Sequence, residues 1–295
     1  MIRQCTETLK GKNPLMLDKN RKVSLIIAVY KDVEALKLIM DALRYQTYTD
    51  FEVVIAEDGE NTQMREYIES IKDFNIKHTT QEDLGIRKTR SLNNGIIASS
   101  GDFLIFIDGD CVPYSTFVES YVKLAEDGYV LSGRRMNLGP KYSKKLRDRE
   151  LSTLTLEKTF LFRYLFIAKD AIERHSEDGF RVSPDGWIYK TFIKNRKAST
   201  SILGCNYACF KKDIVEINGY DEAYRDTAVG DDTDLEWRFK AIGLKLKSAK
   251  YVANVFHLYH PRSIREKISS DWALELMEEK KRSKQFKCEQ GIDRH

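Results

Sequence analysis

Short apolar runs alternate with helical periodicity through the first third of the chain, and this alternation is the strongest constraint on its fold. Residues 23–30 and 103–107 are continuous runs of β-forming apolar residues, a pattern typical of strands buried on both faces of a parallel sheet. Helices and strands that take turns along a chain favour an open α/β sheet with helices on both faces. We expect helices over residues 33–45, 62–71 and 87–98, and further strands over residues 51–56 and 76–79.

Two carboxylates, those of Asp108 and Asp110, follow directly on the strand expected at residues 103–107. Alternate residues of an extended chain point to the same side, so the two residues are about 6.5 Å apart along the backbone. Buried anions without a partner are unfavourable, so we expect a cation beside them. Carboxylate oxygens in this arrangement suit a hard divalent ion, whose shell water and substrate phosphates complete. An acidic turn at the surface is the alternative interpretation.

Polar residues follow the other expected strands as well. Tyr30 ends the first strand, and Asp58 closely follows the strand over residues 51–56. Ligands of open α/β sheets bind outside the carboxyl ends of the strands. We therefore expect these two side chains to converge with Asp108 and Asp110 in one crevice.

Acids and histidines later in the chain are candidates for a general base and for metal ligands. Asp231 and Asp232 open an expected helix. Helix capping explains one such acid, and a second acid that faces the pocket is placed to act as a general base, the role we assign to Asp232. His257 and His260 follow a strand-like run. Either imidazole can complete a metal shell begun by the strand-end acids, and a structural role is the alternative.

Charge and cysteine content narrow the function classes. The 295 residues include 49 basic and 45 acidic ones, for a net charge of +4, which argues against a nucleic-acid-binding surface and fits a nucleotide-sized anion.

The five scattered cysteines form no disulfide framework, and we expect Cys205 and Cys209 to be core thiols in a reducing compartment. No run of about 18 apolar residues predicts a membrane span, and the first residues lack the apolar core of a signal peptide. We therefore expect a cytoplasmic protein.

Residues 139–200 interrupt the alternation with a long, charged, amphipathic helical pattern. Between Lys141 and Lys197, fourteen basic residues stand against eight acidic ones, so positive charge is concentrated there. A solvated helical insertion is one interpretation. Because basic amphipathic helices also lie on anionic membranes, the segment could instead shape an acceptor site, form a lid or contact such a membrane.

Taken in order, these motifs resemble those of the family 2 inverting glycosyltransferases, which have the GT-A fold. The resemblance covers residues 22–135 and 200–262. Asp108-Gly109-Asp110 is similar to the family's metal-binding DXD motif, and residues 230–238 look like its ED-type catalytic motif. Residues 257–260 are similar to the C-terminal part of galactosyl- and N-acetylgalactosaminyl-transferring relatives, including bacterial chondroitin-type polymerases. The other matching segments are residues 23–30, 57–59, 83–87, 93–95, 204–208 and 219–222.

The resemblance implies an α/β fold of the GT-A type, which is Rossmann-like and has a mostly parallel central sheet flanked by helices, here with a helical insertion. It divides the chain into four parts. These are a nucleotide-sugar-binding half (1–135), a helical basic insertion that forms an acceptor or lid region (136–200), an acceptor and catalytic half (201–262), and a C-terminal amphipathic helix (263–295).

Site residues follow from the same resemblance, position by position. It implies that the donor is bound by Val29, Tyr30, Asp58, Gly85, Arg87, Arg90, Asn93, Asp108 and Gly109. It implies Mn²⁺ or Mg²⁺ on Asp108, Asp110, His257 and His260, catalysis by Asp231 and Asp232, and an acceptor side at Gly204, Asn206 and Trp237. Two departures matter. The family often has Arg-Asn where this chain has Leu92-Asn93, so Arg87 or Arg90 is expected to contact the pyrophosphate, and Asp231 stands in place of a glutamate.

The implied function is metal-dependent inverting transfer of a sugar from a UDP-sugar to a hydroxyl of a bacterial-type surface-glycan precursor. A retaining glycosyltransferase and a non-catalytic glycan-binding module are the alternatives. A sugar nucleotidyltransferase is disfavoured because residues 29–34 lack the glycines that would hold a triphosphate. The expected partners are the UDP-sugar, a glycan or lipid-linked glycan acceptor, and an anionic membrane contacted peripherally at its inner face, with no nucleic acid.

Overall fold

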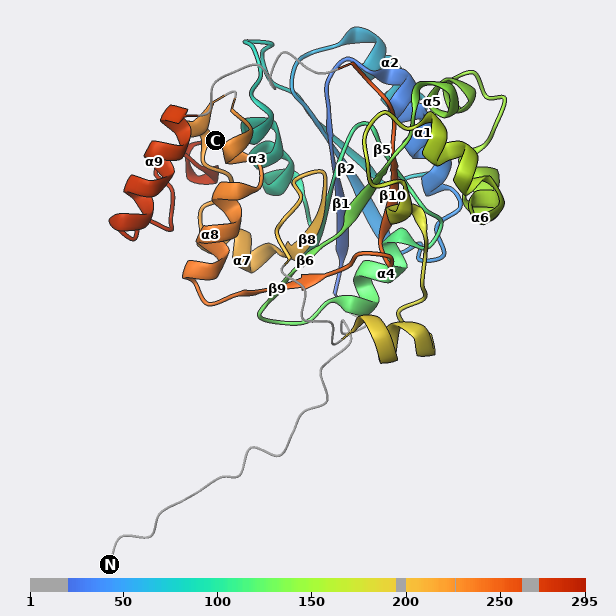
Figure 1. The fold of residues 1–295 in the computed structure, drawn as a ribbon. Coiled ribbons are helices and arrows are strands. Elements are labelled where there is room, and N and C mark those ends of the chain that lie inside the picture. Colours follow the sequence, from blue (N-terminus) through green and yellow to red (C-terminus); the bar gives the residue numbers. More distant parts are fainter. Residues whose placement is uncertain (1–20, 195–199, 226, 262–270) are drawn as a thin grey trace, which may run out of the picture.

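The computed structural model describes residues 21–194, 200–225, 227–261 and 271–295. A seven-stranded sheet with the order β3-β2-β1-β4-β8-β6-β9 forms its centre (Figure 1). The strands are β3 (Ile76–Thr79), β2 (Phe51–Glu57), β1 (Val23–Val29), β4 (Phe103–Asp108), β8 (Asn206–Phe210), β6 (Tyr129–Ser132) and β9 (Lys245–Ser248). Residues 1–20, which include Cys5, lie outside the described residues. So do residues 263–270, the beginning of the expected C-terminal part.

The first four strands of this order run parallel, as do β6 and β9, and β8 is antiparallel to both of its neighbours. The α/β fold with a mostly parallel sheet is therefore confirmed. Strand β1 is buried on both faces: Leu25 and Ile27 pack in one hydrophobic cluster, and Ile26 packs in the other. This is the burial that its unbroken apolar sequence predicts.

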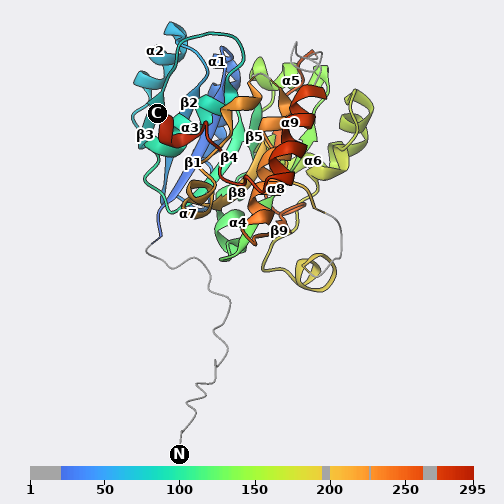
Figure 2. The same ribbon diagram turned by 90° about the vertical axis from the view of Figure 1, so that its left-hand side faces the viewer.

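Helices cover both faces of the sheet (Figures 1 and 2). One face packs against α1 (Val33–Leu43), α2 (Thr62–Ser70) and α4 (Phe117–Leu124), and the other packs against α3 (Lys88–Ala98), α7 (Lys211–Glu216) and α8 (Thr233–Ala241). Asp32 and Asn61 begin the first two helices, because their side chains accept hydrogen bonds from Ala35 N and Met64 N and so cap the free N–H groups of the first turn. The helices and strands expected in this part of the chain are all present.

A second, smaller sheet places the histidines. It consists of β5 (Cys111–Pro113), β10 (Asn254–His257) and β7 (Arg134–Asn137), in the order β5-β10-β7. In the antiparallel register of β5 and β10, His257 lies opposite Cys111. Because Cys111 directly follows Asp110, this register brings the C-terminal histidines to the end of β4. Cys205 and Cys209 are buried as expected.

The basic insertion contains two α-helices, α5 (Pro140–Arg147) and α6 (Thr153–Asp170), followed by the short turns η1 (Ser176–Gly179) and η2 (Tyr189–Ile193). Leu156 and Phe160 of α6 pack into the core, whereas Leu161 and Phe166 of the same helix face outward. Among the described residues, no helix combines the length and the apolar content needed to cross a bilayer.

The C-terminal amphipathic helix is present as α9 (Asp271–Arg282), which lies beside α8 (Figure 2). Ala273 and Met277 of α9 pack against Tyr224 and Val229 in a third hydrophobic cluster. The remaining single turns are η3 (Glu222–Tyr224), η4 (Ala228–Gly230) and η6 (Ile292–Arg294).

Candidate active site

The two acids of the DXD-like segment lie at the end of β4, where the chain passes close to the neighbouring strand β1. Gly109 packs so closely on β1 that an added Cβ would lie 2.8 Å from the carbonyl oxygen of Ala28. A side chain at this position would therefore displace the backbone. Gly109 therefore lets the chain turn closely over β1 between Asp108 and Asp110, at the carboxyl edge of the sheet.

Lys88 joins acids from two distant parts of the chain. Its Nζ lies 2.6 Å from Asp108 Oδ1 and 3.3 Å from Asp231 Oδ2. We call these three residues the lysine bridge. Lys88 is the first residue of α3, and sequence reasoning assigned it no role, although it directly follows Arg87. The bridge brings the DXD-like segment and the acidic loop before α8 into one site, as the sequence predicted.

A second group forms around Asp110. Its Oδ2 lies 3.5 Å from His257 Nε2 and 3.3 Å from His260 Nε2, and one ligand atom from each of the three residues lies within 4.8 Å of the others. We call these residues the histidine cluster. In the part of the chain that the structure describes, this is the group with metal-ligand spacing, and Asp108 lies outside it in the lysine bridge.

Backbone contacts fix the histidine cluster. Leu258 N donates to the carbonyl oxygen of Asp110 at 2.9 Å, and Tyr259 N donates to Ser143 Oγ of α5 at 2.8 Å. The two residues between the histidines are therefore held from both sides. One carboxylate with two imidazoles suits a divalent transition ion such as Mn²⁺ better than Mg²⁺, which prefers oxygen ligands.

The charges of the histidine cluster depend on one another. Burial raises the pKa of Asp110, but hydrogen bonds from His257 and His260 outweigh it and hold that pKa well below its usual range. The hydrogen bond to Asp110 in turn raises the pKa of His260 to about 9. The carboxylate of Asp110 therefore favours the protonated form of the His260 imidazole.

Asp232 stands at the N-cap of α8, yet within the described residues its side chain makes no capping hydrogen bond. Its Oδ2 instead accepts from Gly204 N at 3.4 Å, and its Oδ1 accepts from Thr233 Oγ1 at 3.1 Å. Burial and the charge of Asp231 raise the pKa of Asp232. Gly204 also packs tightly, since an added Cβ would lie 3.3 Å from Asp231 Cβ.

The predicted base-binding residues lie together at the ends of β1 and β2. Asp58 N donates to Val29 O at 3.0 Å, and the Asp58 carboxylate accepts from Gln81 Nε2 and from Arg87 N, each at 2.7 Å. The Tyr30 side chain is half-exposed, and its ring lies beside Gly59, the residue after Asp58. Two donors thereby fix Asp58 in position: Gln81, to which sequence reasoning assigned no role, and the backbone of Arg87, which it assigned to pyrophosphate contact.

The arginines predicted to contact pyrophosphate border a separate hollow of about 360 Å³. Arg87 donates to the carbonyl oxygen of Glu82, and Arg90 Nη1 lies 3.2 Å from Glu222 Oε2. The hollow is lined by Leu84, Gly85, Ile86, Arg87, Thr89, Arg90, Glu222 and Arg225. Three arginines against one glutamate make this surface suited to an anionic group.

Two predicted ligand residues are engaged within the protein. The Asn93 amide donates to Tyr220 O and Glu222 Oε1, both at 2.9 Å. Asn206 donates to the backbone at Arg134 and Ala253 and accepts from Tyr121 Oη at 2.7 Å. Both amides thus tie backbone segments together, and their roles toward donor or acceptor stay predictions.

Trp237, predicted on the acceptor side, lies on α8 rather than beside the lysine bridge. Its indole donates to Asp234 Oδ1 at 2.8 Å, and Arg238 Nε contacts the same carboxylate at 2.6 Å. The Trp237 ring packs against the cluster that contains Ala273 and Met277. The structure therefore places Trp237 between α8 and α9, and its acceptor role stays a prediction.

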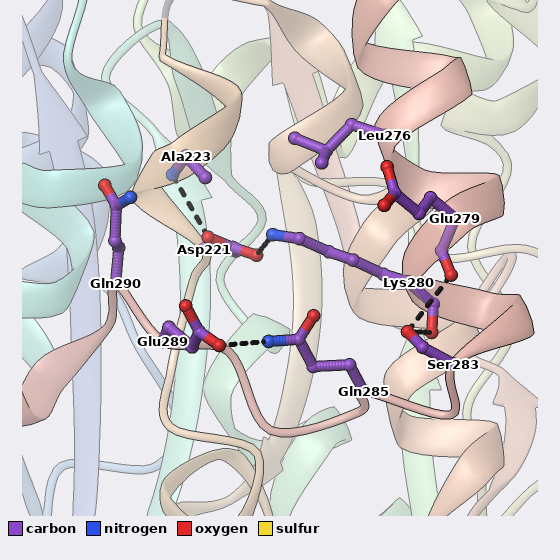
Figure 3. Close-up of a pocket in the computed structure, with 9 residues that line it drawn as sticks. All are labelled: Asp221, Ala223, Leu276, Glu279, Lys280, Ser283, Gln285, Glu289 and Gln290. Carbon is purple, nitrogen blue, oxygen red and sulfur yellow. Dashed lines mark hydrogen bonds and ion pairs between the residues drawn. The ribbon is translucent and has the colours of Figure 1, made fainter.

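Helix α9 braces the segment that carries Glu222. Figure 3 shows Lys280 reaching across a pocket of about 270 Å³ to Asp221, with which it forms an ion pair. Asp221 Oδ1 also accepts from Ala223 N at 3.0 Å and so caps the turn η3. Because Glu222 contacts Arg90 and Asn93, α9 indirectly supports these two residues, which the sequence predicts to bind the donor.

Comparison with known proteins adds to this geometry. The profile described as glycosyl transferase family 2 matches residues 24–198, and the profile described as N-terminal domain of galactosyltransferase matches residues 190–261. The second match includes both histidines of the histidine cluster. Together the two profiles span the sheet and the site.

Named relatives agree with the profiles. Chondroitin synthase of Escherichia coli is 29% identical over 42% of this chain and 20% of its own length. GalNAc(5)-diNAcBac-PP-undecaprenol beta-1,3-glucosyltransferase of Campylobacter jejuni is 21% identical over 69% of this chain and 70% of its own. The structure of GalNAc-T7 with UDP, GalNAc and Mn²⁺ superposes with a TM-score of 0.56 at 16% identity, over 82% of this chain and 45% of that one.

This chain spans less than half the length of the first and third of these proteins, so they inform its shared domain alone. The profile match covers more than half of the chain, and the superposition covers 82% of it with a TM-score of 0.56. The chain therefore belongs to glycosyl transferase family 2 and is a glycosyltransferase with the GT-A fold.

Proposed function

We propose that this protein is a metal-dependent inverting glycosyltransferase that moves a sugar from a UDP-sugar to a hydroxyl of a bacterial surface-glycan precursor. The adjacency of the lysine bridge and the histidine cluster supports this proposal, since their acids Asp108 and Asp110 are two residues apart. Lys88 also links Asp108 to Asp231, the neighbour of the proposed base Asp232, so a metal-ligand group and an acidic base would act on one donor, as displacement at an anomeric carbon requires.

The histidine cluster is the proposed metal centre. Asp110, His257 and His260 would hold Mn²⁺, which supplies neutralising charge for the leaving nucleoside diphosphate. Asp110 is already ionised in this environment, so a ligand anion is ready. The proton of His260 must leave before its nitrogen can bind a metal.

Asp232 is the proposed general base. It would accept the proton of the acceptor hydroxyl while that oxygen attacks the anomeric carbon from the face opposite the leaving group. A raised pKa makes Asp232 a stronger base than an ordinary aspartate, and Gly204 N holds one carboxylate oxygen in place. One displacement of this kind inverts the anomeric configuration.

The lysine bridge fixes the electrostatics beside the base. Lys88 holds Asp108 and Asp231 close together, because each carboxylate contacts its ammonium group. We assign Lys88 to positioning the sugar and phosphate side of the donor, together with Asp108. Asp58 and Tyr30 would then bind the uracil.

The names of relatives support the donor and acceptor classes. GalNAc-T7 was solved with UDP and Mn²⁺, and the Campylobacter jejuni relative is named for an undecaprenol-linked acceptor. By analogy with these proteins, we propose a UDP-sugar donor and a lipid-linked or surface-glycan acceptor.

Turnover of a panel of nucleotide sugars with and without Mn²⁺ tests the proposal. We expect UDP release from one UDP-sugar with Mn²⁺, loss of release with chelator, and no release from GDP-mannose. The anomeric proton of the product, read by NMR, then separates inversion from retention. Donor binding without any transfer or hydrolysis would favour the non-catalytic glycan-binding alternative.

A further inference from the structure

Helix α6 exposes an unusual ridge of large apolar side chains. Leu161, Phe162, Leu165 and Phe166 are 67%, 82%, 77% and 69% exposed. Leu161 and Leu165 are four positions apart, as are Phe162 and Phe166, so each pair is adjacent on the helix surface. The two pairs lie side by side and form one continuous ridge. Figure 1 shows α6 at the outer edge of the molecule, beside α1 and α5.

The ridge is separate from the face that packs into the protein. Leu156, Phe160 and Ile167 of α6 are buried in the main hydrophobic cluster. Helix α6 is thus apolar on two sides, one of which already stabilises the fold. A contiguous patch of exposed apolar side chains usually marks an interaction site, whereas single exposed apolar residues are ordinary.

The exposed charges that α6 itself carries are all positive. Besides the ridge, the exposed residues of α6, all of them within the described part of the chain, are Thr155, Lys158, Ala168 and Lys169. Lys158 stands one turn before the ridge, and Lys169 stands one turn after it. No acid belongs to this exposed set.

Both acids of α6 are turned inward. Glu157 accepts hydrogen bonds from the N and Oγ of Ser115 at 2.7 and 2.8 Å. Asp170 accepts from Tyr142 N at 2.9 Å. The helix therefore separates its charges, with acids against the protein and lysines beside the apolar ridge.

We propose that this ridge docks the protein on an anionic membrane surface. A helix that lies in the plane of a bilayer inserts Leu and Phe side chains at the boundary of the acyl chains, while lysines contact the headgroups. A second copy of the chain fits less well, because two-fold pairing of the ridge would bring Lys158 and Lys169 of both copies together.

The docking face is rigidly connected to the histidine cluster. Helix α5 packs against α6, and Ser143 of α5 accepts the hydrogen bond from Tyr259 N, between the two histidines. A membrane that holds α6 would therefore hold the site at a fixed height. The inference concerns the position of the protein and does not depend on the donor or on the reaction.

Flotation with lipid vesicles tests the proposal. The full chain is mixed with vesicles of phosphatidylcholine, or of phosphatidylcholine and phosphatidylglycerol, and separated on a density gradient. We expect flotation with the anionic vesicles, weakening as salt rises. The double variant Phe162→Ser with Phe166→Ser should lose flotation by about tenfold or more, because the inserted apolar surface is removed.

A matched variant controls for loss of exposed aromatic surface in general. Trp187→Ser with Phe192→Ser removes two similarly exposed rings near η2, and we expect it to float like the unaltered chain. Lys158→Glu with Lys169→Glu should abolish the preference for anionic vesicles. All altered side chains are exposed, so the unfolding temperature should stay unchanged, which separates docking from folding.

Three results would overturn the proposal. These are no flotation at low salt, equal flotation of the ridge variant, or a dimer in solution that the ridge variant abolishes while vesicles stay unbound. Metal-dependent UDP binding, measured by calorimetry on the same samples, should be identical in the ridge variant. Failure of flotation with intact UDP binding would thus reject the docking surface alone, and flotation without UDP binding would reject the proposed function alone.

Discussion

Asp108 and Asp110 lie two residues apart at the end of one strand, yet their carboxylates have different kinds of partner. Asp108 contacts a lysine that it shares with Asp231, whereas Asp110 contacts two imidazoles. A lysine holds its proton over the physiological pH range, but an imidazole can exchange a proton for a metal ion. The lysine bridge therefore has an internal cation of its own, whereas the proposed role of the histidine cluster is to exchange a proton for a metal ion.

The largest expected effect falls beside the lysine bridge, at the proposed base. Asp232→Asn should lower kcat by about 10² to 10⁴, the usual contribution of a positioned general base. Donor affinity should change little, because the proposed mechanism assigns Asp232 to the acceptor hydroxyl and not to the donor. Steady-state kinetics with calorimetry of UDP binding measure both quantities, and unchanged kcat would remove Asp232 from the mechanism.

The histidine cluster should determine metal dependence. Asp110→Ala is expected to weaken Mn²⁺-dependent UDP binding by about 100-fold or more, since it removes the anionic ligand. Chelator should then have no further effect on the variant. Asp102→Ala is a matched control, because Asp102 stands at the opposite end of the same strand. Equal loss of binding in both variants would indicate a general defect.

The lysine bridge should contribute to stability without any metal. Lys88→Met leaves Asp108 and Asp231 facing each other, and we expect unfolding free energy to fall by about 1–3 kcal/mol. Lys88→Arg keeps the charge and should restore much of the loss. Unfolding by denaturant, with Mn²⁺ and with chelator, measures this free energy. A loss of stability seen only with Mn²⁺ would contradict the view that the lysine bridge acts independently of the histidine cluster.

A smaller effect concerns pH. The base acts when ionised, so kcat/KM should fall as pH drops through the pKa of Asp232. The charge of Asp231 raises that pKa and the charge of Lys88 lowers it. Asp231→Asn should therefore move the acidic limb of the profile to lower pH, and Lys88→Met should move it to higher pH. Shifts in the same direction for both variants would contradict this electrostatic account.

The sequence predicted the elements whose signal is local. The unbroken apolar runs of β1 and β4 identified buried parallel strands, and the strand-end rule then brought Asp58 and Asp108 to one edge. His257 and His260 were assigned to the acids of the DXD-like motif from their chemistry and the family resemblance, and the register of β10 against β5 brings them to Asp110.

Other features depend on contacts that no local pattern contains. Lys88 looks like an ordinary surface lysine at a helix start, and only the folded chain places it between two acids 123 positions apart. Asn93 and Asn206 have the residue type of ligand-binding amides, but both bind backbone in the core. Helical periodicity likewise does not distinguish which apolar side of α6 faces the protein.

Mn²⁺ binding to Asp108→Asn and Asp110→Asn variants tests the central claim most directly. The free ion can be followed by electron paramagnetic resonance as each protein is titrated. The account predicts that Asp110→Asn loses Mn²⁺ binding and that Asp108→Asn retains it, because only Asp110 belongs to the histidine cluster. Equal binding by the two variants, or loss in Asp108→Asn alone, would contradict it.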